Sequence, residues 1–403
     1  MSPRTVKIFI RSLFAFLFLN TVVSCSFSDG IKRPEIKKIS QAELDSIALI
    51  YVDSQRNEQI HEFMTKLHRN GAFNGNVLVA EGSKIIYQNS FGYANYLLKD
   101  SLTLASKFEL ASVSKPFTAM GVLKLVEKGK LDLTQTVNDF YPSFPYPDIT
   151  IQHLLSHQSG LPNYLYALEK IWPDQKVGMT NQEAVELLIQ HKPSRYGSPG
   201  GRHQYSNTNY MLLAAIIEKV TGQDFSIYMK EEIFEPARMF NTQVLSKAVY
   251  EKIPTDVIGH DRTWRYSVVQ NYLDGPVGDK GIYSTIHDLY LFDRALRGGR
   301  VIDTALLNAS YIKRSDVSRN GLFGYGYGWR TFNQPDHPVV YHTGWWHGFK
   351  SLFVRDITQN KTIILLTNMA NGSLNHLDEL YKIMDMPVIR SGAYDGGGRY
   401  IGK

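Results

Sequence analysis

The segment Glu109–Leu123 limits what this chain can fold into more than any other part of the sequence. From Phe117 to Val126 the residues are apolar nearly all round a helix, and such a helix belongs inside a protein. Pro116 is compatible with a helix start because the N–H groups of the first turn have no intrahelical partners. Gly129 predicts where the helix ends. The segment therefore predicts a buried helix whose first turn carries polar residues.

Two of these polar residues suggest acyl-transfer chemistry. Ser112 and Lys115 are three positions apart, so they share one face of a helix. Unpaired N–H groups at a helix start can stabilise an oxyanion. Burial disfavours the ammonium form of a lysine, which lets Lys115 take the proton of the serine. The same spacing occurs at Ser310 and Lys313, but no partner motif follows, and we interpret that pair as an exposed serine near an exposed lysine.

Composition sets broad limits on function. A chain of 403 residues can bury a large core and form one large or two ordinary domains. The net charge is +6, and three of these charges lie at Arg4, Lys7 and Arg11, which leaves +3 for the rest. This small excess, without a basic run that contains aromatic residues, does not indicate nucleic-acid binding. The histidines are scattered without metal-ligand spacing, so we predict neither a metal nor an organic cofactor.

The N-terminus resembles the signal of a bacterial lipoprotein. After the basic residues, Ile8–Val23 is mostly apolar but short for a membrane-spanning helix. It ends in a lipobox-like run before Cys25, the single cysteine; an ordinary signal peptide cleaved nearby is the alternative. We predict a signal peptide at 1–25, lipid attached to Cys25, and a polar tether at 26–40. The protein would then face the periplasm, and Ser26 favours the outer membrane by analogy with lipoproteins.

Apolar runs typical of strands occur near both ends of the remaining chain, with helical patterns between them. We predict strands at 75–80 and 84–92, joined by a hairpin, and later strands at 325–330, 339–344, 350–355 and 361–368. Helices are predicted at 41–69, 149–155, 181–191, 211–220, 285–296 and 374–384. The pattern divides residues 41–390 into an α/β part, about 41–130 and 278–390, and a helical part, about 131–277. Residues 391–403 are predicted to be a flexible tail.

Two later triplets complete a pattern with Ser112 and Lys115. Tyr205-Ser206-Asn207 precedes an apolar helix, and His342-Thr343-Gly344 lies on a predicted strand. Together these elements resemble the Ser-x-x-Lys, Tyr-x-Asn and Lys/His-Thr-Gly signatures of the penicillin-recognising serine hydrolases. Their order and spacing resemble the class C β-lactamase and D-Ala-D-Ala carboxypeptidase branch over roughly residues 60–390. Three flanking segments also look like this family: Leu154–Pro162, Ile233–Pro236 and Tyr325–Trp329.

The resemblance implies an α+β fold of the β-lactamase/transpeptidase type, with an antiparallel five-stranded sheet, flanking helices and a mostly helical insertion. It implies an acyl-enzyme on Ser112. Lys115 and Tyr205 would share the proton transfers, because a lysine cation favours the phenolate form of a neighbouring tyrosine; which of them is the base stays open. Asn207 is expected to bind the substrate amide, and the N–H groups of Ser112 and Trp345 the oxyanion. The residues expected to line the substrate site on the strand are His342, Thr343, Gly344 and Trp345.

His342 departs from the lysine that is usual in class C β-lactamases, which lowers the expectation of an efficient β-lactamase. We expect its protonated form to bind a substrate carboxylate, so turnover of such substrates should rise relative to neutral ones as the pH falls. The indoles of Trp345 and Trp346 would narrow the cleft, offer a stacking face or cover core. The predicted substrates are amides, esters or lactams, such as D-amino-acid or cell-wall peptides and small esters. The alternatives are a β-lactamase and a non-catalytic penicillin-binding sensor, and the oligomeric state is not indicated.

Overall fold

The computed structural model describes residues 54–246, 257–261, 266–268, 270–318, 321–333 and 338–389. These residues belong to the second of two compact units, Lys38–Lys403. The predicted signal peptide, Cys25, the tether, the first part of the helix predicted at 41–69 and the tail from residue 391 lie outside them. Within the described ranges, no helix has both the length and the apolar character that a membrane span requires.

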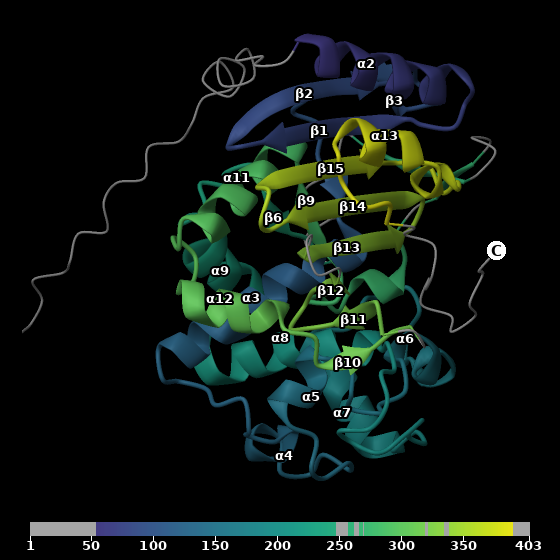
Figure 1. Cartoon of the computed structure of the whole chain (residues 1–403). Coiled ribbons are helices and arrows are strands. Elements are labelled where there is room, and N and C mark those ends of the chain that lie inside the picture. Colours follow the sequence, from purple (N-terminus) through teal and green to yellow (C-terminus); the bar gives the residue numbers. More distant parts are fainter. Residues whose placement is uncertain are drawn as a thin grey trace, which may run out of the picture. The chain divides into compact units, whose positions relative to one another are not determined.

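An antiparallel sheet of eight strands forms the centre of the described unit (Figure 1). Its strands lie in the order β10-β11-β12-β13-β14-β15-β1-β2. Val77 of β1 lies opposite Leu365 of β15, so the first and last strands of the domain are neighbours. The bounds are β10 Ser315–Asp316, β11 Phe323–Tyr325, β12 Arg330–Asn333, β13 Pro338–Trp346, β14 Phe349–Asp356, β15 Lys361–Thr367, β1 Gly75–Glu81 and β2 Lys84–Phe91.

The five strands that the sequence predicted for this sheet are confirmed, but the sheet is wider than predicted. The single strand predicted at 325–330 is wrong: β11 and β12 form an antiparallel hairpin around a turn at 326–329. Gly328 in this turn has φ +80°, which favours glycine. A side chain there would meet the Cβ of Ala119 at 2.5 Å. The glycines therefore mark a turn that packs against the helix beginning at Ser114, where the sequence suggested a glycine-containing strand.

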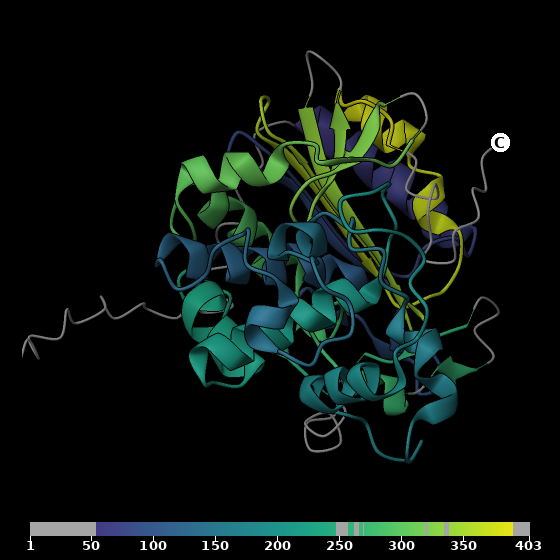
Figure 2. The same cartoon turned by 90° about the horizontal axis from the view of Figure 1, so that it is seen from below.

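Helices cover both faces of the sheet (Figure 2). One hydrophobic core lies between the sheet, α2 (Ser54–Arg69) and α13 (Asp378–Ile383), and contains Val77 and Val79. The other core contains Leu78 and the buried residues of α3 (Ser114–Glu127) and α11 (Ile286–Arg297). Alternate residues of a strand point to opposite faces. Since each face of the sheet is covered by helices, both sets of apolar side chains in β1 are buried. Burial of each large apolar side chain contributes roughly 1.5–3 kcal/mol.

The other α-helices of the described residues lie between Val137 and Tyr311. The predicted bounds of α7 and the cap of α5 at Thr150 are confirmed, and the Thr150 side chain accepts the N–H of His153. Helix α8 begins before the predicted residue 211, because Ser206 has the extended backbone of an N-cap. The bounds are α4 Val137–Phe140, α5 Ile151–Leu155, α6 Tyr164–Ala167, α7 Asn181–His191, α8 Asn207–Thr221, α9 Phe225–Met229 and α12 Thr304–Tyr311.

Small sheets complete the described fold, and one of them leads into the turn that carries Ser112. Strand β5 (Phe108–Glu109) pairs with β9 (Ile282–Ser284), which also pairs with β6 (Gln243–Val244). Strand β5 leads directly into the turn that carries Ser112. The remaining strands are β3 Tyr93–Asn95 with β4 Asp100–Ser101, and β7 Gly259–His260 with β8 Ser267–Val268.

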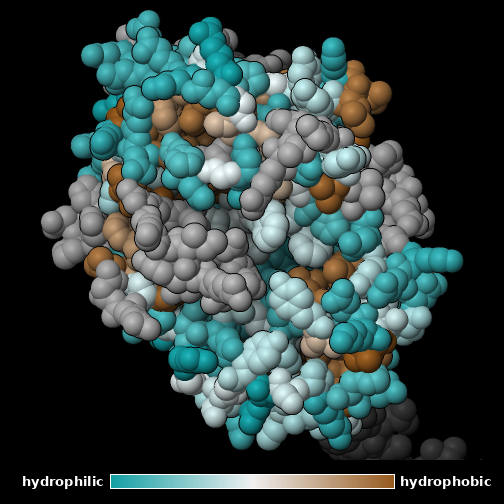
Figure 3. Space-filling view, turned by 90° about the vertical axis from the view of Figure 1, so that its right-hand side faces the viewer, coloured by the Kyte–Doolittle hydropathy of each residue, from teal (hydrophilic) through white to brown (hydrophobic). Residues whose placement is uncertain are grey.

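The described surface is mixed in character. On the face shown in Figure 3, hydrophobic residues form separate patches among hydrophilic ones. Single exposed apolar side chains of this kind are normal and do not by themselves indicate a partner. The large hydrophobic side chains with more than half of their surface exposed are Leu97, Leu98, Tyr166, Val177, Tyr196, Tyr266, Ile312 and Trp345.

Candidate active site

The predicted buried helix is confirmed, with a short 3₁₀ turn before it. Residues Ala111–Val113 form this turn, and α3 follows from Ser114. The phenyl ring of Phe117 stacks on that of Phe292 at a centroid distance of 4.0 Å, which fixes the helix in the core. Lys115 is fully buried, whereas Ser112 keeps partial exposure. The turn therefore presents the serine at an accessible surface and holds the lysine beneath it.

Lys115 joins three segments that are distant in the sequence. Its Nζ lies 2.9 Å from Ser112 Oγ and 2.8 Å from Asn207 Oδ1. It also donates to the backbone carbonyl of Asp279 at 3.0 Å. The structure thus brings Ser112, Lys115 and Asn207 together. The sequence did not indicate Asp279, because a backbone carbonyl leaves no signal in residue type.

Tyr205 lies beside Lys115 at the entry to α8. Lys115 Nζ lies 4.9 Å from the centroid of the Tyr205 ring, and the Arg330 guanidinium carbon lies 5.3 Å from it. Both groups lie over the ring of Tyr205, a position that is favourable for a positively charged group. The predicted proximity of Tyr205 and Lys115 is therefore present in the structure. Arg330 was not among the predicted site residues.

A buried histidine fixes the backbone on both sides of Tyr205. His157 Nδ1 accepts the N–H of Ser206 at 3.3 Å and the side-chain amide of Asn209 at 2.9 Å. The His157 carbonyl accepts the N–H of Gln204 at 2.8 Å, and its ring lies 4.3 Å from that of Tyr205. Burial, helped by His203 and Lys115, holds the pKa of His157 well below its usual range. The only signal for His157 in the sequence is the family-like segment Leu154–Pro162 that contains it.

The end of β13 lies directly against the turn that carries Ser112. A Cβ on Gly344 would come within 2.3 Å of the Leu110 carbonyl and 3.1 Å of the Ala111 Cβ, so this close approach requires glycine. In the described residues, β12 pairs with β13 only over 338–341, whereas β14 pairs with it as far as Trp346. Residues 342–346 therefore present one strand edge beside Ser112. Thr343, which lies on this edge, is partly exposed.

His342 is a buried neutral side chain, whereas the sequence suggested one that becomes protonated and binds a carboxylate. It is fully buried, and its Nδ1 lies 2.8 Å from the Thr343 carbonyl, which can only accept. The proton is therefore on Nδ1, and Nε2 accepts from the Tyr325 hydroxyl at 3.0 Å. Burial, with the nearby cations Arg330 and Lys115, holds the pKa of His342 well below its usual range. The expectation that a protonated His342 binds a substrate carboxylate is inconsistent with this geometry.

A pH experiment tests the neutral His342. Since its pKa is depressed, the ring stays neutral from pH 8 down to pH 5.5. The ratio of kcat/KM for a carboxylate-bearing ester to that for its neutral analogue should therefore stay constant over this range. Taking the ratio removes losses of activity common to both substrates. A ratio that rises severalfold toward pH 5.5, and no longer does so in His342→Gln, would show that the histidine becomes charged after all.

The two adjacent tryptophans have different environments. Trp346 Nε1 donates to Asp274 Oδ1 at 2.5 Å, and its ring packs against the larger core. Trp345 is 55% exposed. Trp346 thus covers core and anchors the end of β13, while Trp345 offers an exposed aromatic face next to the site.

Glu109 is a buried carboxyl group that the sequence analysis did not identify. Its Oε1 accepts the N–H of Ala111 at 3.1 Å and that of Gly281 at 2.8 Å. Burial raises the pKa of Glu109 to about 8, against the opposing effect of the Gly281 hydrogen bond. The carboxyl group therefore links the turn that carries Ser112 to the segment that carries Asp279. Ala111 itself has φ +50°, so this link stabilises a turn with an uncommon backbone conformation.

Comparisons with known proteins identify the family to which this fold and these contacts around Lys115 belong. The family model described as Beta-lactamase matches residues 57–383, and the chain belongs to this family. Family membership supports a serine hydrolase as the general class. Within the described residues, no group of three or more His, Cys, Asp or Glu side chains could hold a metal ion.

Particular relatives are consistent with this family. The chain is 40% identical to "Penicillin-binding protein 4*" of Bacillus subtilis (strain 168) over 73% of this chain and 68% of the relative. The solved penicillin-binding protein from Bacillus halodurans has a TM-score of 0.69 at 24% identity, over 80% of this chain and 97% of that one. D-amino acid amidase from Ochrobactrum anthropi SV3 has a TM-score of 0.68 at 23% identity, over 82% and 98%. These two structures show a shared fold.

Proposed function

We propose that this chain is a serine hydrolase that forms an acyl-enzyme on Ser112. The observation that carries the proposal is the set of contacts around Lys115 Nζ. A neutral amine has two N–H bonds and one lone pair, and the carbonyl oxygens of Asn207 and Asp279 can only accept. They take the two N–H bonds, so the lone pair is directed at Ser112 Oγ, 2.9 Å away. This arrangement supports Lys115 as the base.

The proposed reaction has two steps. Lys115 takes the proton of Ser112 while Oγ forms a bond to the substrate carbonyl carbon, and the N–H groups of Ser112 and Trp345 stabilise the oxyanion. The leaving amine or alcohol then receives the proton by way of Tyr205, and the bond to the leaving group breaks. Asn207 orients the substrate amide. Water hydrolyses the ester on Ser112 in the second step and restores the serine.

The proposed substrates are extended, acyl-containing molecules, with D-amino-acid or cell-wall peptides first and small esters second. The strand edge at residues 342–346 supports this choice, because an extended peptide can add to an exposed edge by main-chain hydrogen bonds. The relative at 40% identity is named for penicillin binding, which favours a β-lactam as a further acylating ligand. Efficient β-lactam turnover is the alternative activity, and the neutral His342 argues against it.

A substrate panel run beside covalent labelling tests this function. The panel contains nitrophenyl esters, a D-Ala-D-Ala peptide with its L-Ala-L-Ala control, and a chromogenic cephalosporin, and a fluorescent penicillin labels the nucleophile. We expect turnover of an ester or D-peptide and labelling that depends on Ser112. Persistent labelling without hydrolysis of any panel member would instead support the non-catalytic sensor. Turnover of the cephalosporin above all others would support the β-lactamase.

We also propose that the protein is a lipoprotein attached through Cys25 to the outer membrane and facing the periplasm. The support is the sequence alone: a basic start, a short apolar segment and a lipobox-like run. Cys25→Ala should move the protein from the membrane fraction to the soluble fraction, because the lipid attachment is lost. Fractionation of cells after a salt wash measures this. Retention of the variant in membranes would refute the anchor.

A further inference from the structure

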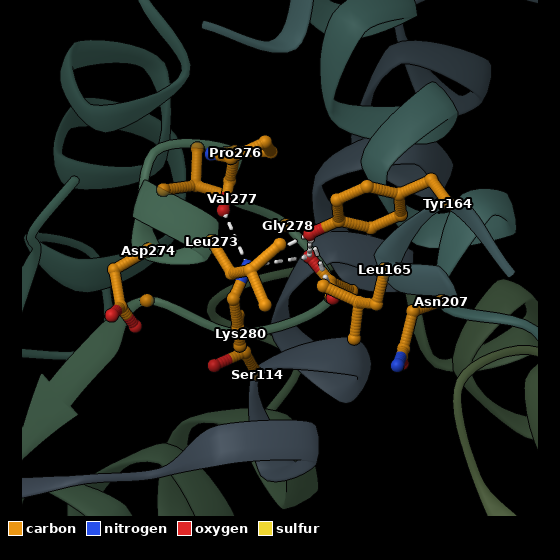
Figure 4. Close-up of polar contacts among 12 residues, drawn as sticks. Ser114, Tyr164, Leu165, Asn207, Leu273, Asp274, Pro276, Val277, Gly278 and Lys280 are labelled. Atoms are coloured by element: carbon orange, nitrogen blue, oxygen red, sulfur yellow. Dashed lines mark hydrogen bonds and ion pairs between the residues drawn. The ribbon is translucent and has the colours of Figure 1, made fainter. Parts of the chain in front are cut away.

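A buried pair of opposite charges lies on the segment whose backbone is bonded to Lys115. Asp279 and Lys280 are 1% and 4% exposed, and Lys280 Nζ lies 3.7 Å from Asp279 Oδ1. Tyr164 bridges the pair, since its hydroxyl lies 3.3 Å from Asp279 Oδ1 and accepts from Lys280 Nζ at 2.8 Å. Figure 4 shows the Lys280 side chain directed toward Tyr164. Neither charge was singled out by the sequence, in which the two residues are simply neighbours.

Surrounding contacts hold this pair away from water. Lys280 Nζ also donates to the Pro276 carbonyl at 2.8 Å and lies 5.3 Å from the ring centroid of Trp346. Burial and the Asp279 charge raise the pKa of Tyr164 well above its usual range. The hydroxyl therefore stays protonated and donates a hydrogen bond to the Asp279 carboxylate. The charges are therefore fixed in position, and solvent screens them little.

The segment that carries the pair is attached to the nucleophile's helix. The carbonyl of Asp279 accepts from Lys115 Nζ, and the carbonyl of Gly278 accepts from Thr118 Oγ1 at 2.7 Å. The N–H of Ile282 donates to Ser114 Oγ at 3.3 Å. The backbone carbonyl of Asp279 is bonded to Lys115 Nζ, and the two charges belong to that residue and the next one. Their fields therefore reach Lys115 through a weakly polar interior.

We propose that Asp279 and Lys280 form a charge pair that sets the pH range in which Lys115 takes the proton of Ser112. This inference rests on the proposed function of Lys115 as the base. The Asp279 carboxylate favours the ammonium form of Lys115, and the Lys280 ammonium disfavours it. Neither side chain is a hydrogen-bond partner of Lys115 Nζ, so the two charges act on Lys115 through their electric field. Loss of one charge should therefore move the acidic limb of the pH profile of the acylation rate. Loss of both charges should return this limb to its native position.

Other ionisable groups face Lys115 and have to be separated from this effect. Tyr205 and Tyr210 present their rings to its ammonium, and Arg330 adds a constant positive charge nearby. His157 and His342 stay neutral because burial depresses the pKa of each. Glu109 interacts with Lys280 and has a pKa of about 8 because of burial. Each profile is therefore recorded both in the native chain and in the Glu109→Gln background.

The experiment measures the second-order rate of Ser112 acylation by a fluorescent penicillin from pH 5 to pH 10. Asp279→Asn leaves Lys280 unbalanced and should move the acidic limb down by about 1 pH unit. Lys280→Met leaves Asp279 unbalanced and should move it up by about 1 pH unit. The double variant Asp279→Asn/Lys280→Met should return it close to the native position. A general loss of packing would lower the rate without shifts of opposite sign.

Shifts in the same direction, or no shift in either single variant, would overturn the proposal. Urea unfolding identifies variants that remain folded. Should Lys280→Met fail to fold, the comparison of Asp279→Asn with the double variant supplies the test, because removal of the Lys280 charge must then move the limb up. If labelling no longer depended on Ser112 or Lys115, the proposed function itself would fail. Normal dependence on both with an unmoved limb would refute the charge pair alone.

Discussion

Lys115→Met should lower the rate of Ser112 acylation by about 10³-fold, within the range that positioned proton transfer contributes. Methionine fills much of the same buried space but provides no group that can take the serine proton. The loss should appear in the acylation rate rather than in the affinity for the ligand, because Lys115 lies beneath Ser112 and not on the strand edge. Stopped-flow labelling with a fluorescent penicillin measures the two separately. A rate within tenfold of the native value would exclude Lys115 as the base.

Serine variants provide the controls for this experiment. Ser112→Ala should abolish labelling, while Ser310→Ala and Ser114→Ala should keep most of it. Ser310 is buried and donates to the Leu307 carbonyl at 2.6 Å, so its interpretation as an exposed serine is wrong. Lys313 bonds to Asp316 at 2.6 Å instead, as expected for a pair without catalytic chemistry. Labelling that is lost in a folded Ser310→Ala but kept in Ser112→Ala would reverse the assignment of the nucleophile.

Glu109→Gln should make the folded protein more stable at high pH, by an amount on the order of 4 kcal/mol at pH 8. The pKa of Glu109 is raised by burial from 4.5 to about 8, so the folded state holds its proton more tightly than the unfolded chain. This contribution is fully present below pH 4.5 and is lost as the pH rises through 8. Glutamine keeps an oxygen for the N–H groups of Ala111 and Gly281 and never ionises.

Urea unfolding between pH 5 and pH 9 measures this effect. The native chain should lose stability across the range, and Glu109→Gln should lose markedly less. Glu62→Gln is the matched control, because Glu62 is exposed on α2 and its replacement should leave the native pH dependence unchanged. Parallel curves for the native chain and Glu109→Gln would show that Glu109 does not hold a proton in the folded state.

Local patterns predicted much of the secondary structure. The bounds of α7, the Thr150 cap and the five central strands follow from the spacing of apolar residues and from short-range hydrogen bonds. The hairpin of β11 and β12 was missed because alternating glycines and aromatics suggest a strand as readily as a turn. The turn between these strands depends on the close approach of Gly328 to α3, which is a contact between distant parts of the chain.

The sequence by itself predicted that Ser112 and Lys115 share a face, and the resemblance to a family added Asn207 and the His-Thr-Gly strand. The structure places Ser112 and Asn207 within hydrogen-bond distance of Lys115. Only the tertiary structure decided how these groups behave. Lys115 meets Asn207 and Asp279 across 92 and 164 residues of chain. The pKa values of His342 and Glu109 are shifted chiefly by burial. The physical reason is that side-chain spacing is a local property, whereas desolvation and the direction of a lone pair depend on every segment that packs around the group.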